Sequence, residues 1–144
     1  MEMSKIELKD ITLDYTDQGN VYHALDGVTF SVEEGEFVSL IGSSGCGKST
    51  TLSILAGLNN PQSGSFLIDG QETRGSGKDR GVVFQHYSLF PWMSVRKNIE
   101  FGIKQNFPKL SKKELTAKAM EYLEKVGLKG FENKYPYQLS GGMQ

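Results

Sequence analysis

A glycine-rich run followed by lysine and serine is the segment of this sequence best suited to chemistry. Glycines let backbone N–H groups approach phosphate oxygens closely, and a helix that starts at the lysine adds its positive N-terminal end. The run fits the pattern G-x-x-x-x-G-K-[ST] and predicts a phosphate-binding loop. In such a loop Lys48 contacts the β- and γ-phosphates, and the Ser49 hydroxyl ligates Mg²⁺. The residues are Gly42, Ser43, Ser44, Gly45, Cys46, Gly47, Lys48 and Ser49.

The segments on either side of this loop match the context that the pattern needs. Residues 37–41 form a short, mostly apolar run that is typical of a buried strand. Residues 48–58 place Leu52, Leu55 and Ala56 at helical spacing. A random match somewhere in a chain of this composition has a probability of about 2–3%. The strand–loop–helix order therefore favours nucleotide binding over a structural glycine turn. We interpret Cys46 as a small buried filler and not as a redox residue.

The elements that position the loop are predicted from hydrophobic periodicity. Apolar and polar residues alternate over residues 11–15 and again over 28–32, which predicts two half-buried strands. Residues 65–68 and 81–84 predict two further strands.

The clearest helix is predicted over residues 111–126. Ser111 and Glu114 form a capping box, and Gly127 ends the helix. Two i,i+4 ion pairs support it, Glu114 with Lys118 and Glu121 with Lys125. Its apolar stripe comprises Leu115, Ala119, Tyr122, Leu123 and Val126.

The composition bounds the class of protein. The chain has 144 residues, 38% of them hydrophobic and 23% charged, which fits one soluble globular domain. Lys and Arg number 16 and Asp and Glu 17, so the net charge of −1 argues against a nucleic-acid partner. The single cysteine excludes an internal disulfide and indicates a reducing compartment. We see no signal peptide and no run of 18 apolar residues, so a membrane role would need a partner.

A second motif stands at residues 139–144 and resembles the signature motif of the ATP-binding cassette (ABC) ATPases. It reads Leu139, Ser140, Gly141, Gly142, Met143 and Gln144. Residues 135–138 resemble the usual lead-in to that motif, and residues 83–85 resemble the Q-loop. Together with the phosphate loop, three motifs occur in the family's order. Residues 89–92, with Val95, Asn98 and Ile99, are most similar to the nitrate, sulfonate and taurine importer branch.

The resemblance implies an α/β fold of the P-loop NTPase class. In this family an antiparallel β-subdomain precedes the phosphate loop, and a helical subdomain follows the Q-loop. We therefore expect residues 1–84 to hold the β-subdomain and the phosphate-loop core. Residues 85–144 are expected to hold the Q-loop, the helical subdomain and the signature motif of the same domain.

The resemblance also implies ATP and Mg²⁺ as cofactors. Thr50 joins the phosphate-loop residues, and Gln85 matches the residue that bridges Mg²⁺, the attacking water and the membrane partner. An aromatic residue ahead of the loop stacks on adenine in this family. Tyr15 is the better match, because residues 16–24 look like a short insertion, and Tyr22 remains the alternative.

The implied partners follow from the same resemblance. The apolar segment from Tyr87 to Trp92 is interpreted as the contact with a transmembrane permease, with core packing as the alternative. Ser140, Gly141 and Gly142 would contact the γ-phosphate bound to a second copy in a head-to-tail dimer. A substrate-binding protein would act indirectly, and the protein would lie peripherally at the cytoplasmic face of the cell membrane.

One part of the family's chemistry is not found in the chain. The family carries an apolar run ending in Asp-Glu after the signature motif, and the sequence contains no Asp-Glu pair. Residues 66–69 precede the Q-loop and are interpreted as a strand entering a turn, while His23 and His86 are interpreted as ordinary surface or strand-end residues. We therefore expect a cassette truncated after the signature motif, without the C-terminal part of its core sheet. Such a chain would bind ATP weakly or not at all and would not hydrolyse it.

Two other classes of function stay open at this point. One is a non-hydrolysing nucleotide-binding fragment or regulatory module. The other is a soluble ABC ATPase of translation or DNA repair. The sequence does not name a transported solute, because specificity in such systems lies in other chains.

Overall fold

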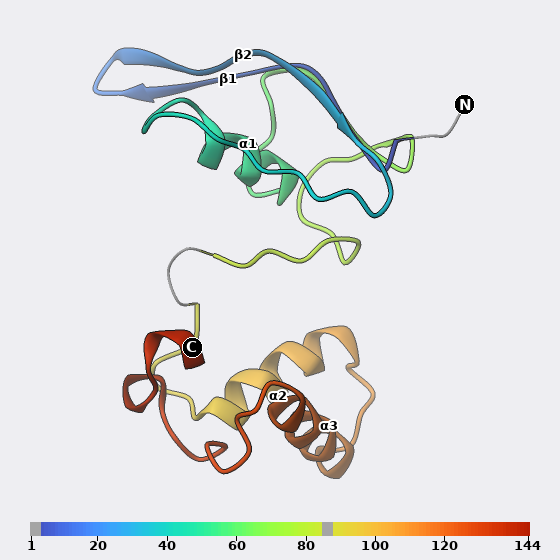
Figure 1. Cartoon of the computed structure of the whole chain (residues 1–144), viewed down its shortest axis with the longest axis vertical. Coiled ribbons are helices and arrows are strands. Elements are labelled where there is room, and N and C mark those ends of the chain that lie inside the picture. Colours follow the sequence, from blue (N-terminus) through green and yellow to red (C-terminus); the bar gives the residue numbers. More distant parts are fainter. Residues whose placement is uncertain (1–3, 85–87) are drawn as a thin grey trace. The chain divides into compact units, whose positions relative to one another are not determined.

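The structure is a computed structural model that describes residues 4–84 and 88–144. The chain forms two compact units, Met1–Val82 and Val83–Gln144 (Figure 1). Each unit has its own hydrophobic core. Within the described residues, none of the helices combines the length and the apolar character needed to cross a membrane.

The first unit is built on a four-stranded antiparallel sheet with the order β2-β1-β3-β4. Its long β1–β2 hairpin is the blue ribbon of Figure 1. The hairpin and β3 confirm the strands predicted over residues 11–15, 28–32 and 65–68. The strands are β1 (Ile6–Asp17), β2 (Asn20–Val32), β3 (Ser63–Ile68) and β4 (Gln71–Glu72).

The turn of the hairpin is tight and is formed by two residues. Asp17 pairs with Asn20, and the two residues between them, Gln18 and Gly19, have φ values of 48° and 83°. Two central residues with positive φ define a type I′ turn, whose twist matches that of the flanking strands. Residues 16–24 therefore consist of two paired strand ends and a tight turn.

A β-bulge in β1 decides which side chains enter the core of the first unit. The pairing of β1 with β2 shifts register between Leu8 and Ile11, and Asp10 there has a φ of 48°. The extra residue moves the buried positions from even to odd numbers, so Leu8 and Ile11 are both fully buried. The core of this unit comprises Leu8, Ile11, Leu13, Leu25, Ile54 and Phe66.

Helix α1 (Lys48–Leu55) begins at the predicted lysine and ends three residues before the predicted end at residue 58. Thr51 and Ile54 are its buried residues, whereas Leu52 is exposed, contrary to the prediction. The helix stops because the chain turns at Gly57, which has a φ of 71°. A side chain on Gly57 would overlap the backbone at Gly75, so only glycine allows this approach.

Two predicted strands are not formed. Residues 37–41 and 81–84 are irregular, and Phe37, Ile41 and Val83 are 91%, 93% and 100% exposed. A buried parallel strand needs hydrogen-bonding neighbours, and within the described ranges neither run has a strand beside it. Both runs are apolar, but apolar composition alone does not provide the hydrogen-bonding partners that a strand requires.

The second unit is helical. It contains α2 (Val95–Asn106), α3 (Lys112–Lys125) and two short 3₁₀ turns, Pro136–Gln138 and Gly141–Met143. Helix α2 was not predicted; Ser94 caps it by accepting a hydrogen bond from the Lys97 N–H at 3.4 Å. The core of the unit consists of Val95, Leu123 and Leu139, with Ile99, Met120, Leu128, Phe131 and Met143 packed against them.

The capping box of α3 is confirmed. The Glu114 N–H donates to the Ser111 hydroxyl at 3.3 Å, and the Ser111 N–H donates to the Glu114 carboxylate at 2.9 Å. The predicted pair of Glu121 and Lys125 is also present, at 2.6 Å.

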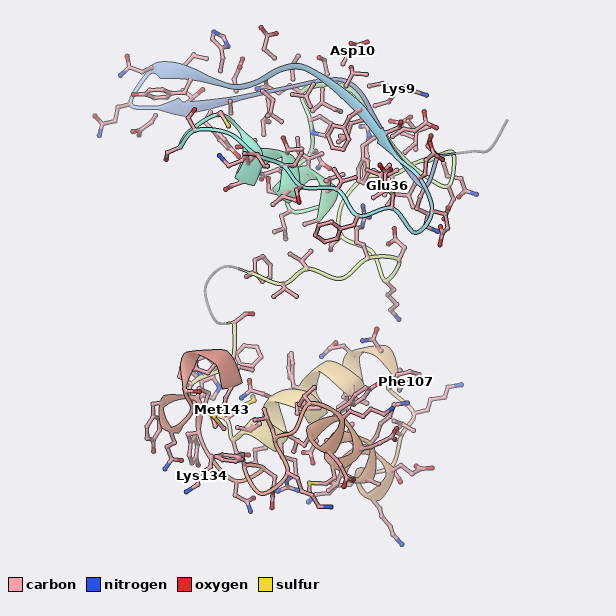
Figure 2. The ribbon with its side chains drawn as sticks, in the orientation of Figure 1. Lys9, Asp10, Glu36, Phe107, Lys134 and Met143 are labelled. Carbon is pink, nitrogen blue, oxygen red and sulfur yellow. The ribbon has the colours of Figure 1, made fainter. Side chains whose placement is uncertain are left out.

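The prediction for Lys118 and for part of the apolar stripe is wrong. The Lys118 ammonium lies 4.2 Å from the ring centroid of Phe107, a residue labelled in Figure 2, instead of pairing with Glu114. Tyr122 and Val126 are exposed, so the buried part of the stripe is narrower than its sequence indicated. An open, largely apolar groove of about 820 Å³ runs beside them.

The capping box makes the stability of α3 dependent on pH. Hydrogen bonds from the hydroxyl and then the N–H of Ser111 hold the pKa of Glu114 below its ordinary value. A depressed folded-state pKa stabilises the protein above the unfolded pKa, and this contribution is lost as pH falls through the folded value. We expect Glu114→Gln to unfold at a lower temperature than the wild type at pH 7 and at nearly the same temperature near pH 3.

The measurement is thermal unfolding followed by helical circular dichroism at both pH values. Lys113→Gln, a change at an exposed neighbouring residue, serves as the control and should show no such difference. An equal loss of stability at both pH values would contradict the assigned role of the carboxylate.

Candidate nucleotide-binding site

The glycine-rich loop enters α1 through backbone conformations that suit glycine. Gly45 and Gly47 have φ values of 81° and 92°. Gly47 is the N-cap of α1 and has no side chain that could accept a hydrogen bond. The first N–H groups of the helix therefore have no side-chain cap and point toward the loop. These unpaired donors and the positive end of the helix make the loop suited to an anion such as a phosphate.

Lys48 folds back over the loop that precedes it. Its ammonium donates hydrogen bonds to the carbonyl oxygens of Gly42 at 2.8 Å and Ser43 at 2.6 Å. It also lies 3.4 Å from the sulfur of Cys46. The single cation of the loop is therefore held above the amides that the motif predicts to bind phosphate.

Cys46 is exposed, which corrects the expectation that it is a buried filler. Its sulfur lies across the loop, 2.6 Å from where a Cβ on Gly42 would be. A side chain at position 42 would displace the thiol, so Gly42 and Cys46 together keep the loop compact.

The loop is fixed in place against the sheet. A Cβ on Gly47 would lie 2.7 Å from the carbonyl oxygen of Ala24 and 2.6 Å from a methyl carbon of Leu25. Both distances are too short for any side chain, so the backbone of the loop lies directly on β2. The sheet thus determines where the start of α1 is placed.

Of the two residues predicted to bind Mg²⁺, Ser49 lies in the first turn of α1 and Gln85 lies outside the described residues. Over residues 4–84 and 88–144, no three His, Cys, Asp or Glu side chains gather into a metal site. Magnesium in nucleotide sites usually keeps waters and takes other ligands from phosphates. Ser49 is exposed in the first turn of α1, next to Lys48, and could supply one hydroxyl ligand. Thr50 follows it and is half-buried.

The two tyrosines considered for adenine face each other across the hairpin. Tyr15 and Tyr22 are direct partners in the β1–β2 register and are 43% and 56% exposed. The Tyr15 hydroxyl accepts a hydrogen bond from the Asn59 amide at 2.9 Å. His23 is exposed, and its Nδ1 lies 2.7 Å from an Asp14 carboxylate oxygen, in keeping with the surface role expected for it.

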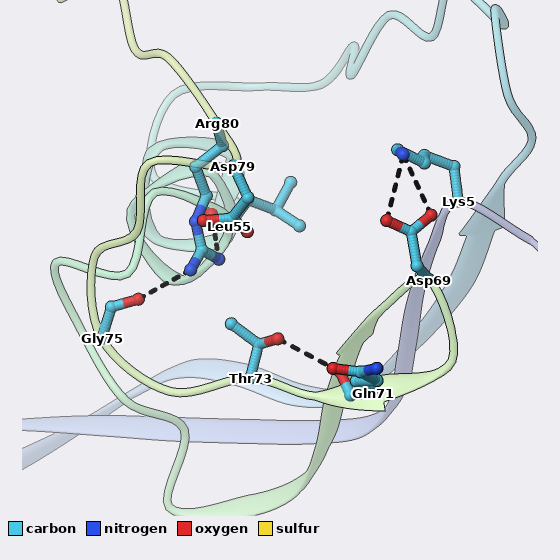
Figure 3. A network of polar contacts seen from close by, with 8 residues as sticks. All are labelled: Lys5, Leu55, Asp69, Gln71, Thr73, Gly75, Asp79 and Arg80. Carbon is cyan, nitrogen blue, oxygen red and sulfur yellow. Dashed lines mark hydrogen bonds and ion pairs between the residues drawn. The ribbon is translucent and has the colours of Figure 1, made fainter. Parts of the chain in front are cut away.

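Arg80 supports the other end of α1, and the sequence did not mark it. Its guanidinium donates to the carbonyl oxygens of Leu55 at 3.2 Å and Gly75 at 2.9 Å (Figure 3). It also lies 5.4 Å from the ring centroid of Phe66. The side chain therefore ties the last turn of α1 to the loop that follows β4. Nothing in the local sequence separates it from the exposed Arg74.

The signature residues divide into buried anchors and an exposed turn. Leu139 is buried in the core of the second unit, and Met143, labelled in Figure 2, packs against that core. Between these anchors, Ser140, Gly141 and Gly142 are exposed. A Cβ on Gly142 would meet nothing within 4 Å, so packing inside this unit does not require a glycine there.

A buried asparagine orders the aromatic segment that precedes α2, residues 89–93, through hydrogen bonds to its backbone. The Asn98 side chain accepts from the Phe90 N–H at 2.7 Å and donates to the carbonyl oxygens of Met93 at 3.2 Å and Ser94 at 3.1 Å. Trp92 on this segment is 69% exposed, and its ring centroid lies 5.4 Å from that of Phe90. Core packing does not describe Trp92. Gln85, His86 and Tyr87 lie outside the described residues.

A glycine-rich loop that rests against the sheet and leads into a helix, with its lysine folded over it, is typical of a P-loop nucleotide-binding protein. The sequence family described as ABC transporter matches residues 25–144. The chain belongs to this family, and its fold is that of a P-loop ABC ATPase.

Relatives with assigned names support the same grouping. The chain is 48% identical to a nitrate import ATP-binding protein, NrtD of Synechocystis, over 96% of its own length and 52% of that protein. It is 44% identical to a taurine import ATP-binding protein, TauB of Pelagibacter ubique, over 90% of its length and 48% of that protein. It is also 48% identical to an uncharacterized ABC transporter ATP-binding protein of Methanocaldococcus jannaschii, over 97% and 52% of the two lengths. The chain spans about half the length of these curated relatives.

A solved structure shares the fold. The ATP-binding cassette MJ0796, determined as a dimer in a post-hydrolysis state bound to ADP and Pi, superposes with a TM-score of 0.81. The two chains are 34% identical, and the match covers 95% of this chain and 64% of that one. The combination of sheet, phosphate loop and helical unit therefore exists in a cassette that binds nucleotide.

The contact between the loop and β2 gives a paired test. Gly45 and Gly47 both have positive φ, but only a Cβ on Gly47 would collide with neighbouring atoms. We expect Gly45→Ala to cost about 1–2 kcal/mol through backbone strain alone. Gly47→Ala should cost about 2–4 kcal/mol, because overlap with Ala24 and Leu25 adds to the strain.

Urea unfolding of the two variants, followed by circular dichroism, measures the difference. Equal losses of stability in both variants would show that the loop does not rest on β2 as described.

Proposed function

We propose that this chain is the nucleotide-binding part of an ATPase subunit that energises solute import through a membrane permease. The observation that carries the proposal is the phosphate loop, with Lys48 folded over glycine carbonyls at the start of α1. The import functions of the named relatives indicate a small solute such as nitrate, taurine or another sulfonate. In this role the protein would lie peripherally at the cytoplasmic face of the membrane.

In the proposed site the chain's own residues bind and orient the nucleotide. The loop amides from Gly42 to Gly47 and the Lys48 ammonium would hold the β- and γ-phosphates, and the Ser49 hydroxyl would ligate Mg²⁺. Magnesium supplies charge neutralisation to the phosphates when it is bound. Lys48 already lies within hydrogen-bonding reach of the loop, so it needs only to exchange neutral carbonyl partners for charged phosphate oxygens.

The signature turn would complete the site of a second copy. Ser140, Gly141 and Gly142 are exposed while Leu139 and Met143 anchor the turn from below. The steric freedom around Gly142 supports close approach of a ligand from outside this unit. We propose a head-to-tail dimer in which the Ser140 hydroxyl and the amide of Gly142 contact the γ-phosphate held by the partner.

The exposed aromatic segment would receive the permease. Trp92 presents its ring to solvent on a loop that Asn98 holds by several hydrogen bonds. A large aromatic side chain on an ordered loop is suited to anchor a protein interface. Leu89 of the same segment also lines an apolar groove, together with Ile99.

We further propose that the chain by itself binds ATP weakly and does not hydrolyse it. It carries no Asp-Glu pair to support Mg²⁺ and polarise a water. Positioning of the attacking water dominates the rate of phosphoryl transfer, so a bound nucleotide without that group should remain intact.

The role of Lys48 is tested by ligand-observed NMR with ATP and with inorganic tripolyphosphate. We expect Lys48→Ala to weaken binding of both about 10-fold or more, because a charge-assisted hydrogen bond contributes about 1.5–3 kcal/mol. Lys78→Ala removes the same charge from an exposed site in the same unit and should leave both affinities unchanged. Phosphate release should be no faster for the wild-type chain than for Lys48→Ala.

Equal ATP binding by the wild type and Lys48→Ala would contradict the phosphate site. Phosphate release by the wild type above the Lys48→Ala level would contradict the absence of hydrolysis.

The permease contact is tested by crosslinking in a Cys46→Ser background, which removes the single native thiol. We expect Trp92→Cys to form an adduct with a co-expressed permease of the nitrate or taurine type. Lys113→Cys, exposed in the same unit, is the matched control and should give none. Adducts of equal yield at both positions, or none at Trp92→Cys, would exclude this segment as the contact.

A further inference from the structure

Asn59 connects the hairpin to the helix that starts at the phosphate loop. Its side-chain amide donates to the Tyr15 hydroxyl at 2.9 Å and to the Ser53 hydroxyl at 3.0 Å. Ser53 in turn donates to the carbonyl oxygen of Thr50 at 2.7 Å, in the first turn of α1. A continuous line of hydrogen bonds therefore runs from Tyr15 in β1 to a predicted phosphate-loop residue.

The loop that carries Asn59 is itself fixed to the helix. The N–H groups of Leu58 and Asn59 both donate to the carbonyl oxygen of Ser53, at 2.9 and 3.2 Å. Three residues further on, the Gln62 N–H donates to the carbonyl oxygen of Thr12 at 2.9 Å, and its side chain accepts from the Asp14 N–H at 3.0 Å. Asn59 is thus held from both sides, so its amide is a fixed support for the Tyr15 hydroxyl.

The bond distinguishes the two tyrosines that face each other in the hairpin. Tyr15 and Tyr22 are both partly exposed, but among the described residues only Tyr15 has a hydrogen-bonding partner for its hydroxyl. An aromatic ring that is already ordered loses less conformational entropy when a ligand stacks on it. The phosphate loop contacts β2 at Ala24, two residues or about 7 Å along the strand from Tyr22. The Tyr15–Tyr22 pair therefore lies within the length of one nucleotide from the loop.

We propose that Asn59 is a positioning residue for base recognition. If the chain binds ATP as proposed above, Asn59 fixes the Tyr15 ring relative to α1. The aromatic surface and the phosphate loop then form one preorganised site. The affinity for the base then depends on Asn59, whereas the affinity for the triphosphate does not.

The test compares ATP with inorganic tripolyphosphate, each bound to the full chain and followed by ligand-observed NMR. Asn59→Leu keeps the branched shape and the number of heavy atoms of the side chain and removes the amide. We expect it to weaken ATP binding about 5- to 10-fold, the effect of losing roughly one hydrogen bond, and to change tripolyphosphate binding less than twofold. Tyr15→Phe keeps the ring, removes only the hydroxyl, and should give a similar loss.

Three further variants separate positioning from a general structural role. The double variant Asn59→Leu with Tyr15→Phe should bind ATP no worse than either single variant, because both remove the same bond. Asn59→Asp should restore most of the affinity, because a carboxylate accepts from the tyrosine and serine hydroxyls. Tyr22→Phe, the cross-strand control, should match the wild type.

The outcomes are distinct. Parallel losses of ATP and tripolyphosphate affinity in Asn59→Leu, or unchanged ATP affinity in both Asn59→Leu and Tyr15→Phe, would overturn this inference and leave the phosphate site intact. Failure of the wild-type chain to bind either ligand would overturn the proposed function and the inference with it.

Discussion

Contact between the backbone of Gly47 and the carbonyl of Ala24 is the constraint on which the nucleotide site depends. It brings the glycine-rich loop onto β2 at a distance that excludes every side chain. Close contact with the sheet holds the loop, and hydrogen bonds from the Lys48 ammonium and the Cys46 N–H to loop carbonyl oxygens add to it. At the far end of α1, Arg80 donates a hydrogen bond to the carbonyl oxygen of Leu55. A site formed by backbone donors benefits from such external support, since N–H groups that donate to carbonyl oxygens of the loop are not free for an anion.

Local chemistry explains what could be predicted from the sequence. The capping box of Ser111 and Glu114, the start of α1 at Lys48 and the turn after β3 each depend on residues within a few positions of one another, and each was predicted correctly. The strand predictions for residues 37–41 and 81–84 were wrong, because a strand forms only beside another strand. Apolar composition gives no information about which segments lie beside each other. The supporting side chains could not be predicted either, because their partners are distant in the sequence. Asn59 reaches Tyr15 across 44 positions and Arg80 reaches Leu55 across 25, and no local pattern encodes such distances.

The second unit shows how one short motif can be both structural and functional. Leu139 and Met143 are apolar and face the core, while the three residues between them are small or polar and face outward. Gln144 fixes the turn by donating to the carbonyl oxygens of Pro136 at 2.9 Å and Leu139 at 3.2 Å. The anchors make the exposed turn rigid, and rigidity lowers the entropy that is lost when a ligand binds. The order of residue types in the motif therefore matches two needs: apolar residues anchor the turn in the core, and small or polar residues leave it accessible to a ligand.

Both units hold an exposed functional segment in place, but they use different kinds of contact to do so. In each, an exposed group that is suited to a ligand is held by a partner that is less exposed. Asn98 holds the loop of Trp92, and the sheet holds the phosphate loop. Asparagine is well suited to this task, because its amide donates and accepts at once and can join backbone groups that point in different directions. An alanine there would remove the side-chain partner of the Phe90 N–H and of the Met93 carbonyl, in a part of the unit where Asn98 is itself buried. The order of the exposed segment therefore rests on one buried polar side chain, and a packed apolar residue could not replace it.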